Sequence, residues 1–207
     1  TYYSDLDRSA IARLLTNSDS VSELGKELFY TFCDSSWNDD VDTGRSTGSY
    51  LIIYMGGVVD HSSNMPDPVA LSSAEAEYNE ACLACMATTH MVMLLNELEG
   101  NKQPRLKIPL ILDSKSAIAM GNSFRDTKHT RHILRRYHYV REAVDAGRFQ
   151  LYWIKTDDEL ADIATKQTPG PRHNLLTSIL LVPVIDLVRH VKAAFAKIVQ
   201  YKRGDSI

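Results

Sequence analysis

The sequence predicts a domain of the α/β class, with a mixed sheet that carries helices. Two apolar, β-prone segments, residues 28–33 and 106–112, are each followed directly by an aspartate, Asp34 and Asp113. The second aspartate leads into a helical pattern. An acidic residue at the carboxyl end of a strand that precedes a helix occupies the usual ligand position of an α/β sheet. Between the two segments, apolar residues recur at helical spacing over residues 73–99, and the stripe expected to face the core consists of Leu83, Ala87, Met91, Leu94 and Leu98.

Length and composition favour one domain with extensions. The chain has 207 residues, of which 44% are apolar and 24% charged, which is ordinary globular composition. We expect a leader and linker over residues 1–26, the α/β domain over 27–168 and an amphipathic helical extension over 169–207. A formal net charge of −3 favours a nucleic acid partner only if the positive charges gather in one place.

Cysteine content and hydropathy bear on the compartment. The chain has three cysteines, an odd number, and Cys82 and Cys85 fall inside the predicted helix, where we expect them to pack rather than bind metal. A reducing compartment follows, so the chain is expected to be intracellular and not secreted. Its start has no signal-peptide pattern, and its longest apolar run, residues 179–184, is too short to span a membrane.

The remaining segments alternate between strand and helix patterns. Two β-prone runs, residues 50–55 and 58–61, flank Gly56 and Gly57 and predict an antiparallel meander with the first strand. Further along, the sequence predicts a helix over residues 114–119, a helix over 126–146 that Gly147 ends, a strand over 148–155 and a helix over 157–166.

The start of the long helix supplies a third acidic residue. Ser72 is a typical N-cap, and Glu75 three residues later completes a capping box, which gives Glu75 a structural role. Glu77 is not needed for capping. Small residues follow on its side of the helix, including Ala81, Ala84, Cys85 and Thr88. They would let the helix lie close to the sheet, so Glu77 is a candidate metal ligand.

A fourth acidic residue lies in the last predicted helix of the domain. Asp157, Asp158 and Glu159 suit the positive end of the helix dipole and are expected to cap the helix. Asp162 lies beyond the first turn and therefore needs another explanation. We expect Asp34, Glu77, Asp113 and Asp162 to come together; taken singly, Asp34 also suits a turn.

The predicted helix over residues 126–146 concentrates positive charge. Its basic residues form either a solvated surface or a track for phosphates. A zinc site is not expected there, because no cysteine or acidic residue completes the histidines of this helix.

Seven motifs in order over residues 28–167 resemble the ribonuclease H domain of Ty1/copia-type LTR retrotransposon polyproteins. They are Cys33-Asp34-Ser35-Ser36-Trp37, Arg45-Ser46-Thr47, the run from Val69 to Tyr78, the run from Leu112 to Ile118, Thr127-Lys128-His129, the run from Arg136 to Glu142, and the run from Ala161 to Lys166.

The resemblance implies an RNase H-like fold, a mixed five-stranded sheet flanked by helices, here with an extra C-terminal helical tail. It also implies hydrolysis of the RNA strand of RNA/DNA hybrids. Asp34, Glu77, Asp113 and Asp162 would be both the catalytic residues and the ligands of two Mg²⁺ ions, with Mn²⁺ as an alternative.

The resemblance also suggests partners and surroundings. The expected partners are the hybrid and a reverse transcriptase domain of the same polyprotein, with no membrane and no small-molecule cofactor. The place of action would be the cytoplasm, within a virus-like particle, or the nucleus. Substrate contacts are expected from Ser35, Arg45, Ser46, Thr47, Ser114, Lys128, Arg131 and Arg135.

Two departures from the family pattern concern substrate affinity rather than the four acids. Ser36 stands where the family usually has an aspartate, and residues 60–64 lack the usual tryptophan and basic residues. The tail from Pro169 has no recognised counterpart.

Two alternatives to the active nuclease differ in the role and position that they give to the acidic residues. The first is a catalytically silent RNase H-fold module that binds nucleic acid or a protein, although a binding module gains nothing from burying four acids that repel one another. The second, an integrase-like strand transferase, fits less well, because those sites commonly place a glutamate on a late helix.

Overall fold

The structure of the protein is a computed structural model, and it describes residues 29–40, 42–54, 57–66, 69–100, 107–122 and 134–180. The predicted leader, residues 1–26, and the last part of the predicted tail, residues 181–207, lie outside the described residues.

One five-stranded mixed sheet forms the centre of the domain, in the order β3-β2-β1-β4-β5. The strands are β1 (Phe29–Ser36), β2 (Thr47–Tyr54), β3 (Gly57–Asn64), β4 (Ile108–Leu112) and β5 (Phe149–Trp153). The first three pair antiparallel as the predicted meander, whereas β4 pairs parallel with both β1 and β5. The predicted mixed sheet is therefore confirmed.

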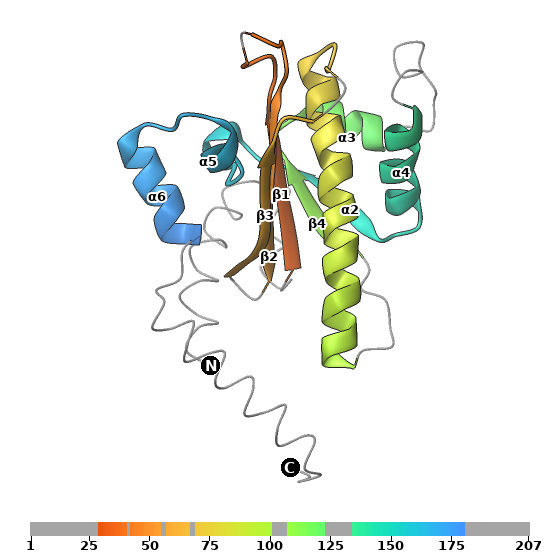
Figure 1. The fold of residues 1–207 in the computed structure, drawn as a ribbon. Helices are drawn as coiled ribbons and strands as arrows, with labels where there is room; N and C mark the ends of the chain where they lie inside the picture. The colour runs from red at the N-terminus through yellow and green to blue at the C-terminus, as the bar shows by residue number, and fades with distance from the viewer. Residues whose placement is uncertain are drawn as a thin grey trace.

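Helices cover both faces of this sheet (Figure 1). On one side lie α2 (Ser73–Glu99), α3 (Lys115–Gly121) and α4 (Leu134–Asp145), and on the other lie α5 (Asp162–Thr165) and α6 (Gly170–Leu180). A 3₁₀ turn, η3 (Thr156–Asp158), connects β5 to α5.

Strand β1 is buried on both faces because its apolar residues do not alternate with polar ones. Phe29 and Cys33 face the core under α2, whereas Tyr30 and Phe32 belong to the core under α5 and α6. Leu176 of α6 is buried in that second core. The two faces thus give β1 the central position in the sheet.

Helix α2 lies against the sheet through small side chains. Ala81, Cys85 and Thr88 are all fully or almost fully buried. The apolar stripe expected at the core, Leu83, Ala87, Met91, Leu94 and Leu98, is partly wrong, since Leu94 and Leu98 are 45% and 69% exposed. Small residues permit close packing, Met91 packs partly buried against the core, and Leu94 and Leu98 turn toward solvent.

The ends of α2 are capped much as the sequence predicts. The Ser72 hydroxyl accepts a hydrogen bond from the Glu75 backbone N–H at 3.2 Å. The Glu75 carboxylate accepts from the backbone N–H of Leu71, at 2.9 Å, one residue before the position expected of a capping box. Gly100 ends the helix at a φ of 67°, a conformation that favours glycine.

By length and composition, α2 is apolar enough to cross a membrane, with a mean hydropathy of 1.3 over its most apolar window. Packing against the sheet accounts for part of that composition, because 33% of the window is buried and the small apolar residues of α2 belong to the core.

The helix predicted over residues 157–166 is wrong as a single element. The structure has η3 and α5 in its place, and Glu159 between them has an extended backbone, with φ −71° and ψ 116°. The Glu159 side chain is fully buried and accepts a hydrogen bond from the Ala161 N–H at 3.0 Å. The extended backbone at Glu159 thus separates the two short elements where one helix was predicted.

A pair of buried hydroxyls joins β1 to α2. Thr31 Oγ1 lies 2.8 Å from Thr88 Oγ1, and both residues are 0% exposed. Replacing Thr31 by valine would leave the Thr88 hydroxyl without this partner, so we expect Thr31→Val to lower the free energy of unfolding by about 1–3 kcal/mol.

We expect the double variant Thr31→Val/Thr88→Val to lose less than the sum of the two single variants, because it removes both polar groups and keeps their volume. Urea denaturation of the four proteins measures this. Additive losses would show that the hydroxyl pair contributes nothing of its own.

Candidate active site

Asp34 is held near the carboxyl end of β1, on the face that α5 covers. Its side chain is 0% exposed. The Thr165 hydroxyl donates to Asp34 Oδ2, and Lys166 Nζ lies 3.4 Å from Oδ1. Burial raises the pKa of Asp34, the Thr165 hydroxyl and Lys166 act against that shift, and Asp162 adds to it.

Glu77 reaches the same place from the second turn of α2. It is 8% exposed, and the Ser35 backbone N–H donates a hydrogen bond to its carboxyl group. Its Oε2 atom is buried with no hydrogen-bond partner. Burial, reinforced by the charges of Asp34 and Asp113, raises the pKa of Glu77 to about 9. Without a cation, Glu77 therefore retains its proton at neutral pH.

Asp113 directly follows β4, next to β1 in the sheet. The Thr156 hydroxyl donates to Asp113 Oδ2 at 2.7 Å, and Trp153 Nε1 donates to the Asp113 carbonyl at 2.9 Å. Lys115 lies over the Trp153 ring, 4.2 Å from its centre. The ends of β4 and β5 are thereby fixed together around this carboxylate.

Asp34, Glu77 and Asp113 form one cluster, in which an oxygen from each lies within 4.8 Å of the others. Three carboxylates from three elements suit a hard divalent cation such as Mg²⁺ or Mn²⁺. The partnerless Glu77 Oε2 atom provides a further reason, since a buried oxygen of this kind needs a proton or a cation. The residues present therefore fit a divalent ion.

Asp162, the fourth predicted acid, begins α5 and is 0% exposed. It does not belong to the cluster of three, and its two oxygens instead bind side chains: Lys166 Nζ lies 2.6 Å from Oδ1, and Arg172 Nη2 lies 2.5 Å from Oδ2. Lys166 also contacts Asp34, so it links the fourth acid to the cluster. Burial lowers the pKa of Lys166, but Asp162 and Asp34 outweigh it and raise that pKa overall.

Two further buried acids were not expected at this end of the sheet. Glu80 lies against Gly48 of β2, where an added Cβ would be 2.0 Å from Glu80 Oε2. Glu159 has one oxygen bonded to the Ala161 N–H, whereas its Oε2 is buried without a hydrogen-bond partner. Burial raises the pKa of Glu159 well above its ordinary value, and the nearby acids Asp34, Asp113 and Asp162 raise it further.

Several residues around the acids were given no role from the sequence. Lys166 could have been found, because an aspartate and a lysine four residues apart face each other on a helix. Thr156, Thr165 and Arg172 carry no such signal. Their contacts depend on how the segment from η3 to α6 folds back over the sheet.

The three serines predicted to contact substrate form hydrogen bonds with backbone groups of the chain. Ser46 Oγ accepts from the Asn38 N–H, and Ser114 Oγ caps α3 by accepting from the Ala117 N–H. Ser35 Oγ donates to the Thr47 carbonyl at 3.4 Å. These contacts leave the substrate role of these residues a prediction.

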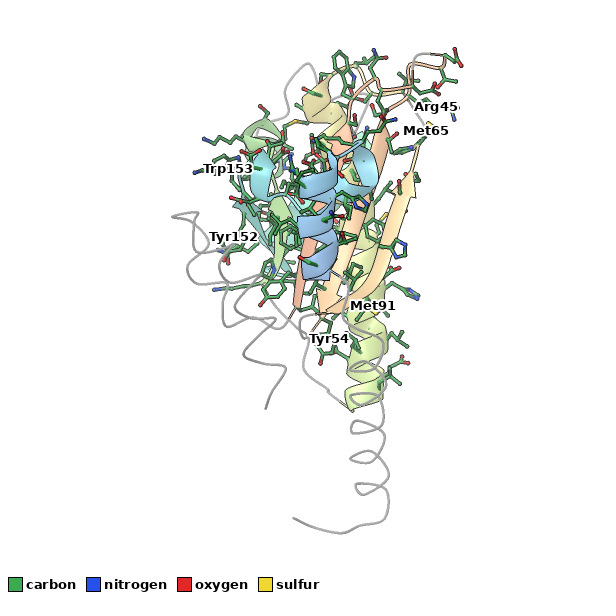
Figure 2. The ribbon with its side chains drawn as sticks, turned by 90° about the vertical axis from the view of Figure 1, so that its left-hand side faces the viewer. Arg45, Tyr54, Met65, Met91, Tyr152 and Trp153 are labelled. Carbon is green, nitrogen blue, oxygen red and sulfur yellow. The ribbon has the colours of Figure 1, made fainter. Side chains whose placement is uncertain are left out.

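The basic residues predicted to contact substrate are described in part. Figure 2 places Arg45 and Trp153 toward the same end of the sheet. Lys128 and Arg131 lie outside the described residues, and Arg135 belongs to α4, with its side chain outside the description.

The fold and its acids define the class. A meander of three antiparallel strands, followed by parallel β4 and β5, carries acids at the ends of β1 and β4 and on the helix that connects β3 to β4. This is the mixed sheet expected of an RNase H-like fold, and that expectation is confirmed.

Comparison with known proteins adds relatives of the chain, although no family model matches it. The chain is 31% identical to the Retrovirus-related Pol polyprotein from transposon TNT 1-94 of Nicotiana tabacum over 144 residues, which make up 70% of this chain and 11% of that polyprotein. It is 31% identical to the corresponding polyprotein from transposon RE1 of Arabidopsis thaliana, over 66% of this chain and 9% of that one.

A third relative is the Transposon Ty1-NL2 Gag-Pol polyprotein of Saccharomyces cerevisiae, with 28% identity over 62% of this chain and 7% of that polyprotein. The chain is thus a homologue of the Pol polyproteins of Ty1/copia-type retrotransposons, as its motifs indicated, and it spans a small part of their length.

Solved structures of RNase H proteins are also similar. RNase H1 from Halobacterium salinarum is 16% identical, with 66% of this chain and 92% of that chain covered and a TM-score of 0.49. LC11-RNase H1, solved in complex with an RNA/DNA hybrid, is 13% identical, with 66% and 92% covered and a TM-score of 0.45.

The stability of the protein should depend on pH through Glu159. The unfolded chain releases this proton near pH 4.5, whereas the folded chain keeps it to higher pH. The contribution of protonated Glu159 to the free energy of unfolding is therefore complete below pH 4.5. It falls as pH rises above that value, by up to about 1.4 kcal/mol per pH unit.

We expect Glu159→Gln to make this decline shallower between pH 5 and 8, measured by urea denaturation at several pH values without metal. Glu142→Gln, at an exposed position of α4, is the matched control and should keep the wild-type slope. Equal slopes in the wild type and in Glu159→Gln would contradict the assignment.

Proposed function

We propose that this chain is a ribonuclease H, a divalent-cation-dependent endonuclease that hydrolyses the RNA strand of RNA/DNA hybrids. The observation that carries the proposal is the cluster of Asp34, Glu77 and Asp113, within 4.8 Å, in a homologue of retrotransposon Pol polyproteins. Neither part is sufficient alone. Acidic clusters occur without catalysis, and homology to a polyprotein does not select one of its activities.

Asp34, Glu77 and Asp113 would hold the ion, for which Mg²⁺ is proposed and Mn²⁺ is the alternative. When bound, such an ion supplies a charge that stabilises the phosphate oxygens and lowers the pKa of a water that attacks phosphorus. Hydrogen bonds from other residues of the chain orient these carboxylates. Thr165 and Thr156 each donate to one oxygen, of Asp34 and Asp113 respectively, and so fix the direction of the other.

Glu77 has a separate role in this proposal. Its pKa of about 9 means that, without a metal ion, Glu77 carries a proton at neutral pH, and this proton removes one negative charge from the cluster. Ion binding would release that proton, so the affinity for a divalent cation should rise with pH up to about 9.

The proposed substrate is the hybrid, recognised by 2′-hydroxyl groups and by the shape of the minor groove rather than by base edges. Arg45, toward the same end of the sheet as Trp153 (Figure 2), remains a proposed phosphate contact. A reverse transcriptase domain of the same polyprotein is the proposed partner, because the relatives are Pol polyproteins. An intracellular site of action agrees with the odd number of cysteines, Cys33, Cys82 and Cys85, all of which are buried.

The test is cleavage of a hybrid that carries a different label on each strand, in the presence of Mg²⁺. We expect cuts in the RNA strand only, and we expect Asp113→Asn to lower the rate by on the order of 100-fold or more. Asp145→Asn, at an exposed position of α4, is the matched control and should cut at the wild-type rate. Thermal denaturation should show that both variants fold.

Hybrid binding in Ca²⁺ separates the enzyme from the silent binding module. Hybrid that binds but is not cut in Mg²⁺ or Mn²⁺ would favour the silent module. Cleavage that survives Asp113→Asn would remove this cluster as the active site.

A further inference from the structure

Two cationic side chains already bind the fourth acid of the site. Lys166 Nζ lies 2.6 Å from Oδ1 of Asp162, and Arg172 Nη2 lies 2.5 Å from Oδ2. The Asp162 side chain is 1% exposed. Both oxygens that a metal ion could use are thus engaged by charge-assisted hydrogen bonds, which are stronger than those between neutral groups.

Lys166 also extends from Asp162 toward the cluster. Its ammonium group lies 3.3 Å from Asp34 Oδ2 and 3.4 Å from Asp34 Oδ1. It therefore contacts both of the acids that a second cation would have to bridge, and these two acids also contact each other. The first cation would share only Asp34 with that position, because Asp34, Glu77 and Asp113 form a cluster without Asp162.

Arg172 is held in place by more than Asp162. Its Nη2 also donates to the Thr156 carbonyl at 2.6 Å, and its Nη1 lies 3.8 Å from Asp157 Oδ1. Its helix, α6, is anchored by Leu176 and Leu180 in the core. The guanidinium is therefore positioned by the fold and is not a loose surface partner.

The charges of the site agree with a single ion. Once an ion has displaced the proton of Glu77, the four predicted carboxylates, Asp34, Glu77, Asp113 and Asp162, face two cationic side chains, Lys166 and Arg172. Two negative charges remain, and one divalent cation neutralises them. A second ion would leave an excess of positive charge unless the two side chains withdrew.

We propose that Lys166 and Arg172 occupy the second cation position of the free chain, which therefore binds one divalent ion, at Asp34, Glu77 and Asp113. The two ions expected from the sequence would require both side chains to leave Asp162. The inference rests on the proposed function for the identity of the first site, but the number of ions is measured without substrate.

The experiment is isothermal titration calorimetry of the full chain with Mn²⁺, in the absence of nucleic acid. We expect one ion per wild-type chain and none for Asp113→Asn. The double variant Lys166→Met/Arg172→Met keeps the apolar stems and removes both charges, so we expect it to bind two. Lys155→Met removes an exposed charge of the same segment and should bind one.

Two ions in the wild-type chain would overturn the inference, and this measurement does not depend on any variant. One ion in a double variant that thermal denaturation shows to be folded would also overturn it, because Asp162 would then be free of both partners and still not bind a metal ion.

The number of bound ions and the cleavage of hybrid test the two proposals independently. A wild-type chain that binds one ion and cuts no hybrid contradicts the proposed function and supports this inference. A chain that cuts hybrid and binds two ions without substrate supports the proposed function and contradicts this inference.

Discussion

The site depends on the burial of several carboxylates close together at one end of the sheet. The parallel pairing of β1 with β4 brings Asp34 and Asp113 to neighbouring strands, and α2 adds Glu77 from above them. Like charges at this separation cannot all ionise in a buried place without compensation. Burial is the main cause of the raised pKa values of Asp34 and Glu77, neighbouring acids raise them further, and hydrogen bonds to both carboxyl groups offset part of the shift.

Most of the compensation comes from one short segment, residues 156–172. It supplies two hydroxyl donors, an ammonium and a guanidinium, which reach acids from β1, β4 and α5. The same segment is fixed to the meander, because Ser49 of β2 donates to the Ala161 carbonyl and Ser63 of β3 donates to the Ala164 carbonyl. The antiparallel strands thus position the groups that balance charge at the ends of the parallel ones.

Much of the fold could be predicted from local pattern, because strands that end in aspartate, a capped helix and a glycine turn are short-range signals. The positions of Asp34, Glu77 and Asp113 followed from such signals together with the family motifs. The break at Glu159 could not be predicted, since it depends on burial of a side chain that its neighbours in sequence would place at a helix start. Arg172 could not either: it lies ten residues from Asp162, and only the folded chain brings them together.

The position of α6 matters for anyone who shortens this chain. A protein that stops at residue 168, the predicted end of the domain, would keep all four acids and Lys166. It would lack Arg172, and Tyr30 and Phe32 would lose the cover that Leu176 contributes to their core. In such a fragment Asp162 would keep Lys166 and lose Arg172 as a partner, so its metal affinity would differ from that of the intact molecule. The exposed rings of Tyr30 and Phe32 would also lower its solubility.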